Sequence, residues 1–405
     1  MNREVLDKIT YLAGSIDVIE KMSEITAKVP FSGEVKALLS EVSKILMKDA
    51  RSRQYSDVVS FAFWIRGTSV TQLEDKYSFR DENCHLGRGV AFHIAPSNVP
   101  VNFAYSLVSG LLTGNANIVR VPSKDFPQVE IITDAFNMAL NECESMKPYI
   151  ALVKYGRSQE INNELSSISD TRIIWGGDQT IAELRKSPLP PRSTEITFAD
   201  RYSIAIIDAD SYLAIENKNR VAQDFYNDTF FSDQNACTSP RVVVWTTSSS
   251  LEILNTAKEQ FWSKLHTLVE EKYIFQDIMG VNKLTSVYLA AADKNIGNIR
   301  VEENADNRIF RVRVNTLTNR LLDYYDNSGY FYEYDCRDIM DLIPLVNNKR
   351  CQTIGYIGDK NKLIRLVASG IKGIDRIVSI GHTMDFDLVW DGYDLVRHLT
   401  REIVI

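Results

Sequence analysis

One cysteine of this chain is placed for covalent chemistry. Cys237 lies in the polar segment FSDQNACTSPR, residues 231–241, and the apolar residues 242–245, VVVW, follow directly. A short apolar run bounded by turn residues predicts a buried strand. A thiol in a polar loop at the end of such a strand is well placed to act as a nucleophile. The alternative is a cysteine that packs as a small apolar residue, and the local context leaves both interpretations open.

A second segment, residues 87–123, predicts a strand, a loop, a helix and a second strand. The strands fall at residues 90–94 and 117–121, which is the pattern of a βαβ unit. Ligands of open α/β sheets bind in the loops that follow the carboxyl ends of strands. Asn98 lies in such a loop. Alternatively, Ser97 or Asn98 caps the start of the following helix or forms a local turn.

Two short motifs together carry a family resemblance: PSNVP at residues 96–100 and QNAC at residues 234–237. They resemble the aldehyde dehydrogenase superfamily and, more narrowly, the acyl-CoA (fatty acyl) reductases of the bioluminescence type. The resemblance implies that Cys237 attacks an acyl thioester, that coenzyme A leaves as a thiolate, and that the acyl group stays on the cysteine. It assigns stabilisation of the oxyanion to the Asn98 side-chain amide and the Cys237 backbone N–H.

The resemblance also implies a nicotinamide cofactor, bound without the GxGxxG fingerprint. Arg120, Ser123 and Lys124 match the positions that contact the adenosine ribose in this superfamily. The two cations would neutralise a 2′-phosphate and favour NADPH, with NADH as the alternative. Gly176 and Gly177 follow a predicted strand and precede a predicted helix, which matches the place where the pyrophosphate rests.

These cofactor candidates also have purely structural interpretations. Arg120 and Lys124 fit an ordinary solvated strand end. Asp178, next to the glycine pair, is an awkward neighbour for a phosphate and fits a helix cap.

A departure from the superfamily pattern indicates the type of reaction. Aldehyde-oxidising members carry a Glu that activates water, whereas the comparable stretch here, residues 196–201, ITFADR, has no Glu at the matching place. Glu195 is one or two positions away. Without a hydrolytic base, a thioester intermediate is protected from water, which suits CoA-linked reduction. For the second family Glu, which holds the nicotinamide ribose, only Asp338 and Asp341 are weak candidates.

The function implied by the resemblance is NAD(P)H-dependent reduction of an acyl-CoA, or another acyl thioester, to an aldehyde through an acyl group on Cys237. One alternative is the reverse reaction, CoA-acylating oxidation of an aldehyde. Another is a subunit that carries an acyl group to a partner. Reductases of this type work beside an acyl-protein synthetase, so an acyl-protein could be the donor.

Composition limits the remaining possibilities. The chain has 405 residues, a formal net charge of −7 and five cysteines with no CxxC pair. These features favour a reduced cytoplasmic protein and argue against nucleic-acid binding. No run of 18 uncharged apolar residues predicts a membrane span. The spacing of Cys84, His85 and His93 fits no common metal site, so no metal is expected.

The fold class implied is α/β of the aldehyde dehydrogenase type. We expect a helical region and a Rossmann-type cofactor domain within residues 1–202, and an α/β catalytic domain at residues 203–375. Residues 376–405 would return to the cofactor domain and end in an exposed strand, residues 400–405, TREIVI. We expect that strand to join a partner's sheet and form a homo-oligomer. Residues 58–65 predict a buried helix.

Overall fold

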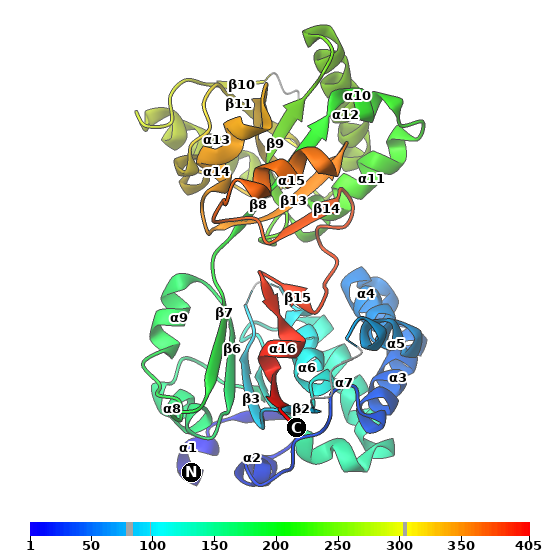
Figure 1. Ribbon diagram of the computed structural model, residues 1–405, viewed down its shortest axis with the longest axis vertical. Helices are drawn as coiled ribbons and strands as arrows, with labels where there is room; N and C mark the ends of the chain where they lie inside the picture. The colour runs from blue at the N-terminus through cyan, green and yellow to red at the C-terminus, as the bar shows by residue number, and fades with distance from the viewer. Residues whose placement is uncertain (78–83, 98, 303–305) are drawn as a thin grey trace. The chain divides into compact units, whose positions relative to one another are not determined.

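The computed structural model describes residues 1–77, 84–97, 99–302 and 306–405. The chain divides into two units, one formed by residues 1–199 with 388–405 and the other by residues 200–387 (Figure 1). The boundaries therefore follow residues 199 and 387, where the sequence placed them after 202 and 375. The second boundary lies later because β14 (Arg376–Ser379) pairs with β13 (Cys351–Ile357) in the sheet of the second unit. Asn98 lies outside the described residues.

A six-stranded sheet forms the centre of the first unit, in the order β1-β5-β4-β3-β6-β7. All pairs are parallel except β1 with β5. The chain passes from β3 to β4 on one side and from β6 to β7 on the other, so the order reverses between β3 and β6. Such a switch point is where open α/β sheets bind ligands. The strands are β1 (Thr10–Ala13), β3 (Val90–Ile94), β4 (Ala116–Arg120), β5 (Ile150–Lys154), β6 (Thr171–Trp175) and β7 (Thr194–Phe198).

Helices cover both faces of this sheet, as parallel strands buried on both sides require. Figure 1 shows α8 and α9 on one face and α6 and α7, with α3 to α5, on the other. The helices of this unit are α1 (Arg3–Leu6), α2 (Ile16–Met22), α3 (Gly33–Lys48), α4 (Ser56–Trp64), α5 (Gly67–Lys76), α6 (Asn102–Leu112), α7 (Pro127–Glu142), α8 (Gln159–Ser167), α9 (Asp178–Leu184) and α16 (Leu395–Leu399).

Two details of these helices differ from the sequence-based expectations. The helix predicted at residues 58–65 is α4, but it is buried on one side only, because Phe61 packs in the core and Phe63 is exposed. Helix α6 begins at Asn102 after the N-cap residue Val101, so Ser97 does not cap it. The loop between β3 and α6 is therefore longer than predicted.

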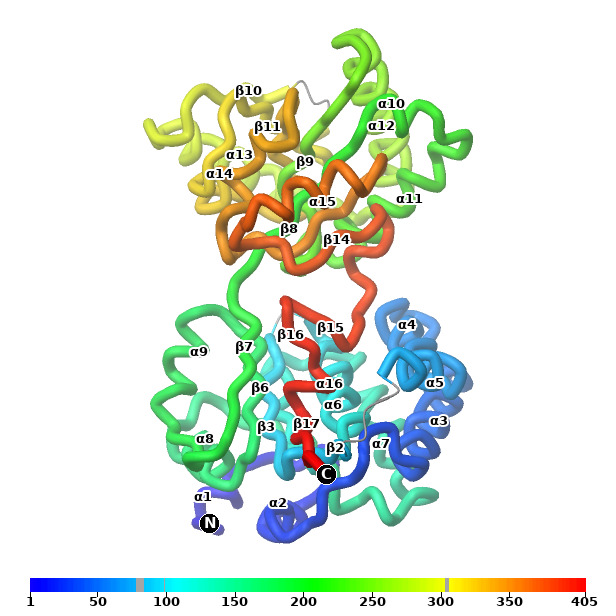
Figure 2. Tube along the Cα trace, in the orientation of Figure 1, coloured from blue at the N-terminus to red at the C-terminus, as the bar shows by residue number. Residues whose placement is uncertain are grey.

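The C-terminal segment returns to the first unit (Figure 2). Its last strand, β17 (Thr400–Ile403), pairs antiparallel with β2 (Cys84–Gly87) of the same chain. A short hairpin, β15 (Val389–Trp390) with β16 (Tyr393–Asp394), precedes it. The predicted terminal strand is thus present, with one edge already paired inside the chain.

The second unit contains a seven-stranded sheet in the order β10-β11-β12-β9-β8-β13-β14. Only β10 runs antiparallel to its neighbour. The other strands are β8 (Tyr202–Asp208), β9 (Pro240–Thr246), β10 (Ile299–Val301), β11 (Phe310–Val314) and β12 (Tyr330–Asp335). The helices are α10 (Ala209–Ala214), α11 (Lys218–Asp228), α12 (Leu251–Lys272), α13 (Asp277–Ala292), α14 (Ile343–Val346) and α15 (Lys360–Ala368).

Alternation along the central strands of this sheet builds two cores. Ile204 and Val244 belong to one apolar cluster, whereas Ile207 and Trp245 belong to the cluster on the opposite face. This follows from the period of two along a strand. Within the described residues, no helix is both long and apolar enough to cross a bilayer.

A buried ion pair ties β6 to β7 in the first unit. Arg172 and Glu195 face each other in register, and Arg172 Nε donates to Glu195 Oε2 at 2.9 Å. Arg172 Nη1 also donates to Ser166 Oγ and to the carbonyls of Leu184 and Ser187, at 2.8–3.0 Å. The carboxylate closest in sequence to the superfamily's water-activating Glu therefore neutralises a buried cation.

We expect Glu195→Ala to lower the free energy of unfolding by about 3–5 kcal/mol, because it leaves the buried Arg172 guanidinium without its counter-charge. Urea unfolding measures the loss. Glu183→Ala, which removes an exposed pair with Lys186, serves as the control and should cost no more than about 0.5 kcal/mol. Equal losses in the two variants would contradict a structural role for Glu195.

Candidate active site

Cys237 lies in the loop between the short 3-10 helix η3 (Phe230–Ser232) and β9, at the amino-terminal edge of the second sheet. The residue is half-buried. Its carbonyl accepts a hydrogen bond of 2.8 Å from Ser203 Oγ at the start of β8. A turn bond from Ser239 N to Ala236 O, 3.0 Å, closes the loop just around the cysteine. The thiol therefore sits on backbone that is fixed on both sides.

The side chain of Gln234 anchors this loop to the neighbouring strand. Its Nε2 donates to the carbonyls of Pro240 and Tyr330 at 2.9 and 3.0 Å. Its Oε1 accepts from the N–H groups of Gly329 and Tyr330 at 3.0 and 3.1 Å. Gln234 and the preceding Asp233 both have a positive φ, 57° and 51°, a conformation that costs energy in a non-glycine residue. The four bonds of one buried amide hold that strained turn in place.

Arg241, four residues after Cys237, is a buried cation beside the same loop. Its guanidinium donates to Gln234 O at 3.1 Å and to Asn327 Oδ1 at 2.9 Å, and it stacks on the Tyr325 ring at 3.9 Å. Burial lowers the pKa of Arg241, and electrostatic interactions with Tyr325, Cys237 and Asp326 oppose that change. An arginine stays charged in proteins. A cation that interacts electrostatically with a cysteine favours the thiolate over the thiol.

A buried carboxylate holds the far side of the cysteine region. Asp228, the last residue of α11, accepts from the N–H groups of Gly381 and Thr383 at 2.6 and 3.0 Å. Burial raises its pKa to about 6, with Asp385 adding repulsion. The next residue in the bound segment, Met384, accepts a bond from Thr238 Oγ1 at 3.1 Å. Asp228 thus connects α11 to the segment that packs on the residue after Cys237.

The predicted cofactor residues lie at the carboxyl edge of the first sheet. Arg120 ends β4, and its Nη2 donates to the carbonyls of Tyr155 and Gly156, both at 3.2 Å. Ser123 and Lys124 follow in an exposed segment. Because β4 is the neighbour of β3 in the sheet, the end of β4 lies next to the carboxyl end of β3.

Gly176 and Gly177 lie at the end of β6, on the other side of β3. A Cβ at Gly176 would come within 3.1 Å of the Thr180 side chain, so the backbone here is close to α9. Gly177 is the N-cap of α9, and Asp178 is its first residue. Asp178 is therefore not the cap that the sequence suggested. The glycine pair thus follows β6, one of the two strands at the switch point between β3 and β6.

A buried polar network joins the strands and the helix around this switch point. Trp175 Nε1 donates to Ser106 Oγ at 3.0 Å, and Ser106 Oγ lies 2.7 Å from His93 Nδ1. His93 Nε2 lies 3.0 Å from Asn117 Oδ1. Burial lowers the pKa of His93 to about 4, so the ring is neutral. The network joins β6, α6, β3 and β4 and gives His93 a structural role.

The remaining sequence candidates have local partners. Asp338 and Asp341 form a capping box at the 3-10 helix η5 (Ile339–Leu342). His382, which was not among these candidates, is exposed, and its Nδ1 lies 2.7 Å from Asp385 Oδ2. Within the described residues, no group of three or more His, Cys, Asp or Glu side chains is placed to hold a metal ion.

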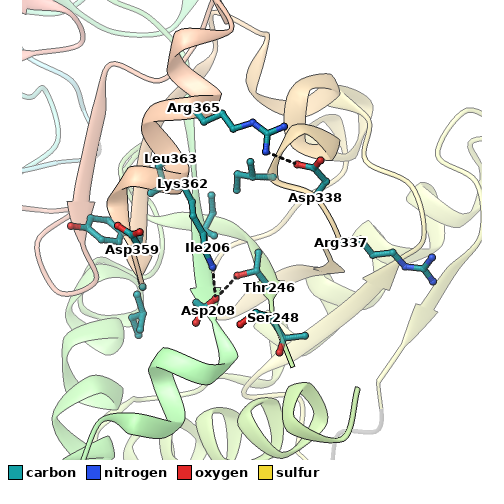
Figure 3. A pocket seen from close by; sticks show the side chains of 15 residues that line it. Ile206, Asp208, Thr246, Ser248, Arg337, Asp338, Asp359, Lys362, Leu363 and Arg365 are labelled. Atoms are coloured by element: carbon teal, nitrogen blue, oxygen red, sulfur yellow. Dashed lines mark hydrogen bonds and ion pairs between the residues drawn. The ribbon is translucent and has the colours of Figure 1, made fainter. Parts of the chain in front are cut away.

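A pocket of about 470 Å³ opens in the second unit at the carboxyl ends of β8, β9 and β13 (Figure 3). Four of the charged side chains that line it form two ion pairs: Lys362 with Asp208 at 3.4 Å and Arg365 with Asp338 at 3.9 Å. Cys237 lies at the opposite, amino-terminal edge of the same sheet and does not line it. The pocket is therefore not the candidate site.

Comparison with known proteins supports the sequence-based resemblance. Residues 71–270 match the family model described as acyl-CoA reductase (LuxC). The long-chain acyl-protein thioester reductase of Aliivibrio fischeri is 23% identical over 301 residues, which are 73% of this chain and 58% of that protein. The protein of the same name from Photorhabdus luminescens is 23% identical over 319 residues, 78% of this chain and 62% of that protein. The chain thus spans about three fifths of these relatives, and the predicted resemblance is confirmed.

Solved structures confirm the predicted fold. Glyceraldehyde-3-phosphate dehydrogenase GapN from Methanocaldococcus jannaschii, complexed with NADP, superposes with a TM-score of 0.66 at 12% identity, covering 100% of this chain and 94% of that one. A 1-pyrroline-5-carboxylate dehydrogenase from Thermus with bound NAD gives a TM-score of 0.63 at 12% identity, with coverages of 97% and 84%. The chain has the aldehyde dehydrogenase fold.

We expect Arg241→Met to slow the alkylation of Cys237 by iodoacetamide at pH 7 on the order of tenfold, the equivalent of ~1.4 kcal/mol of lost charge stabilisation. Intact mass spectrometry with peptide mapping follows the modification of Cys237. Arg241→Lys is the matched control, because lysine keeps the positive charge but cannot make the same hydrogen bonds to Gln234 and Asn327. Cys237 should retain more of its reactivity in this variant than in Arg241→Met. If the two variants lose reactivity equally while circular dichroism shows both folded, the charge is not the cause.

The raised pKa of Asp228 predicts a pH dependence of stability. Its folded-state pKa of about 6 lies above the ordinary value of 3.8, so the folded state binds more protons in this range. The stabilisation is complete below pH 3.8 and is lost as the pH rises through 6. We expect the wild type to lose up to about 3 kcal/mol relative to Asp228→Asn between these limits. Denaturant unfolding of the wild type and of Asp228→Asn at pH 5 and 7.5 measures part of this change, and an equal pH dependence in the two proteins would contradict it.

Proposed function

Because this chain resembles the acyl-CoA reductases of the LuxC type, we propose that it reduces an acyl thioester to an aldehyde through an acyl group carried on Cys237. Reduced nicotinamide nucleotide would be the source of the electrons. The two relatives from Aliivibrio fischeri and Photorhabdus luminescens are named long-chain acyl-protein thioester reductases, and this chain spans only part of their length. The donor proposed here is an acyl-CoA or an acyl-protein.

The observation that best supports this proposal is the construction of the Cys237 loop. A purely packing cysteine needs neither a buried cation nor a strained turn next to it. Here Gln234 uses all four hydrogen bonds of its amide on backbone groups around the loop, and Arg241 adds a buried charge beside the thiol. Such fixed surroundings are what nucleophilic catalysis requires.

The proposed first step is a thiol exchange. The Cys237 thiolate attacks the acyl carbonyl carbon, a new carbon–sulfur bond forms, and the bond to the donor sulfur breaks. The donor, coenzyme A or a protein thiol, leaves as a thiolate and takes up a proton. Arg241 favours the attacking thiolate, and Ser203 and Gln234 fix the backbone from which it attacks.

Charge develops on the carbonyl oxygen during this attack and needs donors. The resemblance assigns that role to the Asn98 side-chain amide and the Cys237 backbone N–H, and Asn98 lies outside the described residues. Removing one such donor typically costs a factor of about 10²–10³ in kcat.

The carboxyl edge of the first sheet fits a nicotinamide dinucleotide. The glycine pair Gly176–Gly177 allows close approach of a pyrophosphate at the switch point, and Arg120 with Ser123 and Lys124 would contact the adenosine ribose. The two cations favour a 2′-phosphate and hence NADPH over NADH. A bound reduced nicotinamide would supply the hydride that converts the acyl group to an aldehyde. Glu195 forms an ion pair with Arg172, so we do not propose it as the base that would activate water to hydrolyse the acyl group.

We also propose self-association through the C-terminal strand, as in the superfamily. One edge of β17 is used by β2. A strand of the partner would therefore have to pair with the other edge of β17 or with residues that follow β17. An acyl-protein synthetase remains the proposed source of an acyl-protein donor.

The function is tested by mixing the protein with acyl-CoAs of increasing chain length and with NADPH or NADH, then following nucleotide oxidation and trapping the aldehyde as a hydrazone. We expect aldehyde with at least one donor and a higher kcat/KM for NADPH than for NADH. Asn98→Ala should lower kcat by about 10²–10³, because it removes an oxyanion donor.

Asn163→Ala, at an exposed position on α8, is the matched control and should leave kcat unchanged. Absence of nucleotide oxidation with every donor, together with stable acylation of the protein, would contradict the reductase and support an acyl carrier instead. Hydrolysis of the acyl group to a free acid would contradict both.

A further inference from the structure

The pocket at the carboxyl ends of β8, β9 and β13 lies where open α/β sheets bind ligands. Strand β8 has β9 on one side and β13 on the other, so the strand order of the second sheet reverses between β8 and β13. Ligands of such sheets bind outside the carboxyl ends of the strands, at that reversal. The cavity of about 470 Å³ has the size of a small-molecule site. Cys237 lies at the amino-terminal edge, so the pocket is separate from the thiol.

The carboxylates that line this pocket serve the protein as helix caps. Asp208, Asp338 and Asp359 are the N-cap residues of α10, η5 and α15. Each accepts a hydrogen bond of 2.9–3.0 Å from a backbone N–H of its own helix. A capping carboxylate is compensated by the positive end of the helix dipole. These three acids therefore offset less of the positive charge in the pocket than their number suggests.

The basic side chains of the pocket, in contrast, have unused hydrogen-bond donors. Lys362 and Arg365 lie three residues apart on α15, on the same face of the helix. Lys362 Nζ lies 3.4 Å from Asp208 Oδ2, and Arg365 Nη1 lies 3.9 Å from Asp338 Oδ1, too far for a hydrogen bond. Arg337, at the rim, forms neither a hydrogen bond nor an ion pair with the residues that the structure describes.

Both cations of α15 are free to turn to a ligand. More than half of each side chain is exposed, and exposed ion pairs of this kind contribute little to stability. Figure 3 shows Lys362 pointing toward Asp208 and Arg365 pointing toward Asp338, with the space of the pocket between the two pairs. Hydroxyl groups of Thr246, at the end of β9, and of the residues after it add further donors. The apolar part of the lining is Ile206, Ile339, Tyr356, Ile357 and Leu363.

We propose that this pocket binds a small organic phosphate, with the phosphate group between Lys362 and Arg365 and the organic part on the apolar lining. A phosphate accepts hydrogen bonds from several directions and pairs well with a guanidinium, whereas a carboxylate would leave more of these donors unused. Strand β9 has seven residues and is about 20 Å long, so a molecule bound here does not reach Cys237 at its other end. This inference does not depend on the proposed function.

Calorimetric titration with phenyl phosphate tests the proposal, because this probe has no adenosine to bind at the proposed nicotinamide site. We expect saturable binding of one phenyl phosphate. Benzoate, which has the same ring and a carboxylate, should bind more weakly. Inorganic phosphate should also bind more weakly, because it makes no contact with the apolar lining.

Two double variants locate the binding. Lys362→Met with Arg365→Met should raise the dissociation constant of phenyl phosphate at least about tenfold, because it removes charge-assisted hydrogen bonds to the phosphate. Lys360→Met with Lys372→Met is the matched control: it removes two positive charges at exposed positions outside the lining and should leave the dissociation constant nearly unchanged. Circular dichroism checks that both proteins fold.

A gain of affinity provides a second test that a folding defect cannot imitate. Asp338→Asn keeps the helix cap, because Asn caps helices as well as Asp does, and it removes the negative charge beside Arg365. We expect this variant to bind phenyl phosphate about two- to fivefold more tightly than the wild type.

Three results overturn the proposal: no saturable binding of phenyl phosphate, benzoate or inorganic phosphate binding as tightly as phenyl phosphate, or equal losses in the two double variants. Acylation of Cys237 is measured separately by intact mass and should be unchanged in the variant that lacks Lys362 and Arg365. The failure of this proposal and the failure of the proposed function are therefore distinguishable.

Discussion

The docking of the Cys237 loop onto the segment before β12 is the interaction on which the rest of the candidate site depends. Two buried polar side chains make it: Gln234 bonds to the backbone of Gly329 and Tyr330, and Arg241 bonds to Asn327 and to Gln234 itself. The parallel pairing of β12 with β9 brings the two segments side by side. Removing either side chain would leave buried backbone groups unpaired, at about 1–3 kcal/mol each. The position of the thiol is therefore tied to the sheet.

The two units supply different parts of the proposed chemistry from different edges of their sheets. In the first unit, β3, β4 and β6 end at the same carboxyl edge, and the strand order reverses between β3 and β6, which is where open α/β sheets bind ligands. In the second unit, Cys237 precedes its strand and lies at the amino edge. The pocket with its two ion pairs lies at the opposite edge of that sheet.

Much of the fold could be predicted from sequence because its central strands are short apolar runs between turn residues. Strand β3 at Val90–Ile94 has the predicted bounds, and β4 at Ala116–Arg120 begins and ends one residue before the predicted strand. The role of Arg241 was missed, because its partner Asn327 is 86 residues away and no local pattern reveals that contact. The same holds for Gln234: its motif was noted, but its bonds to Tyr330 span 96 residues. The start of α6 was misplaced since Pro100 and Ser97 suit a helix start that the loop after β3 delays until Asn102.

The measurement that tests the central claim most directly is the intact mass of the protein after mixing with a long-chain acyl-CoA in the absence of nucleotide. The account predicts an increase equal to one acyl group, mapped to the peptide that contains Cys237 and absent from Cys237→Ala. It also predicts that hydroxylamine removes the adduct, as it does any thioester. Equal acylation of Cys237→Ala, or an adduct mapped to another of the five cysteines, would contradict the assignment of Cys237 as the nucleophile.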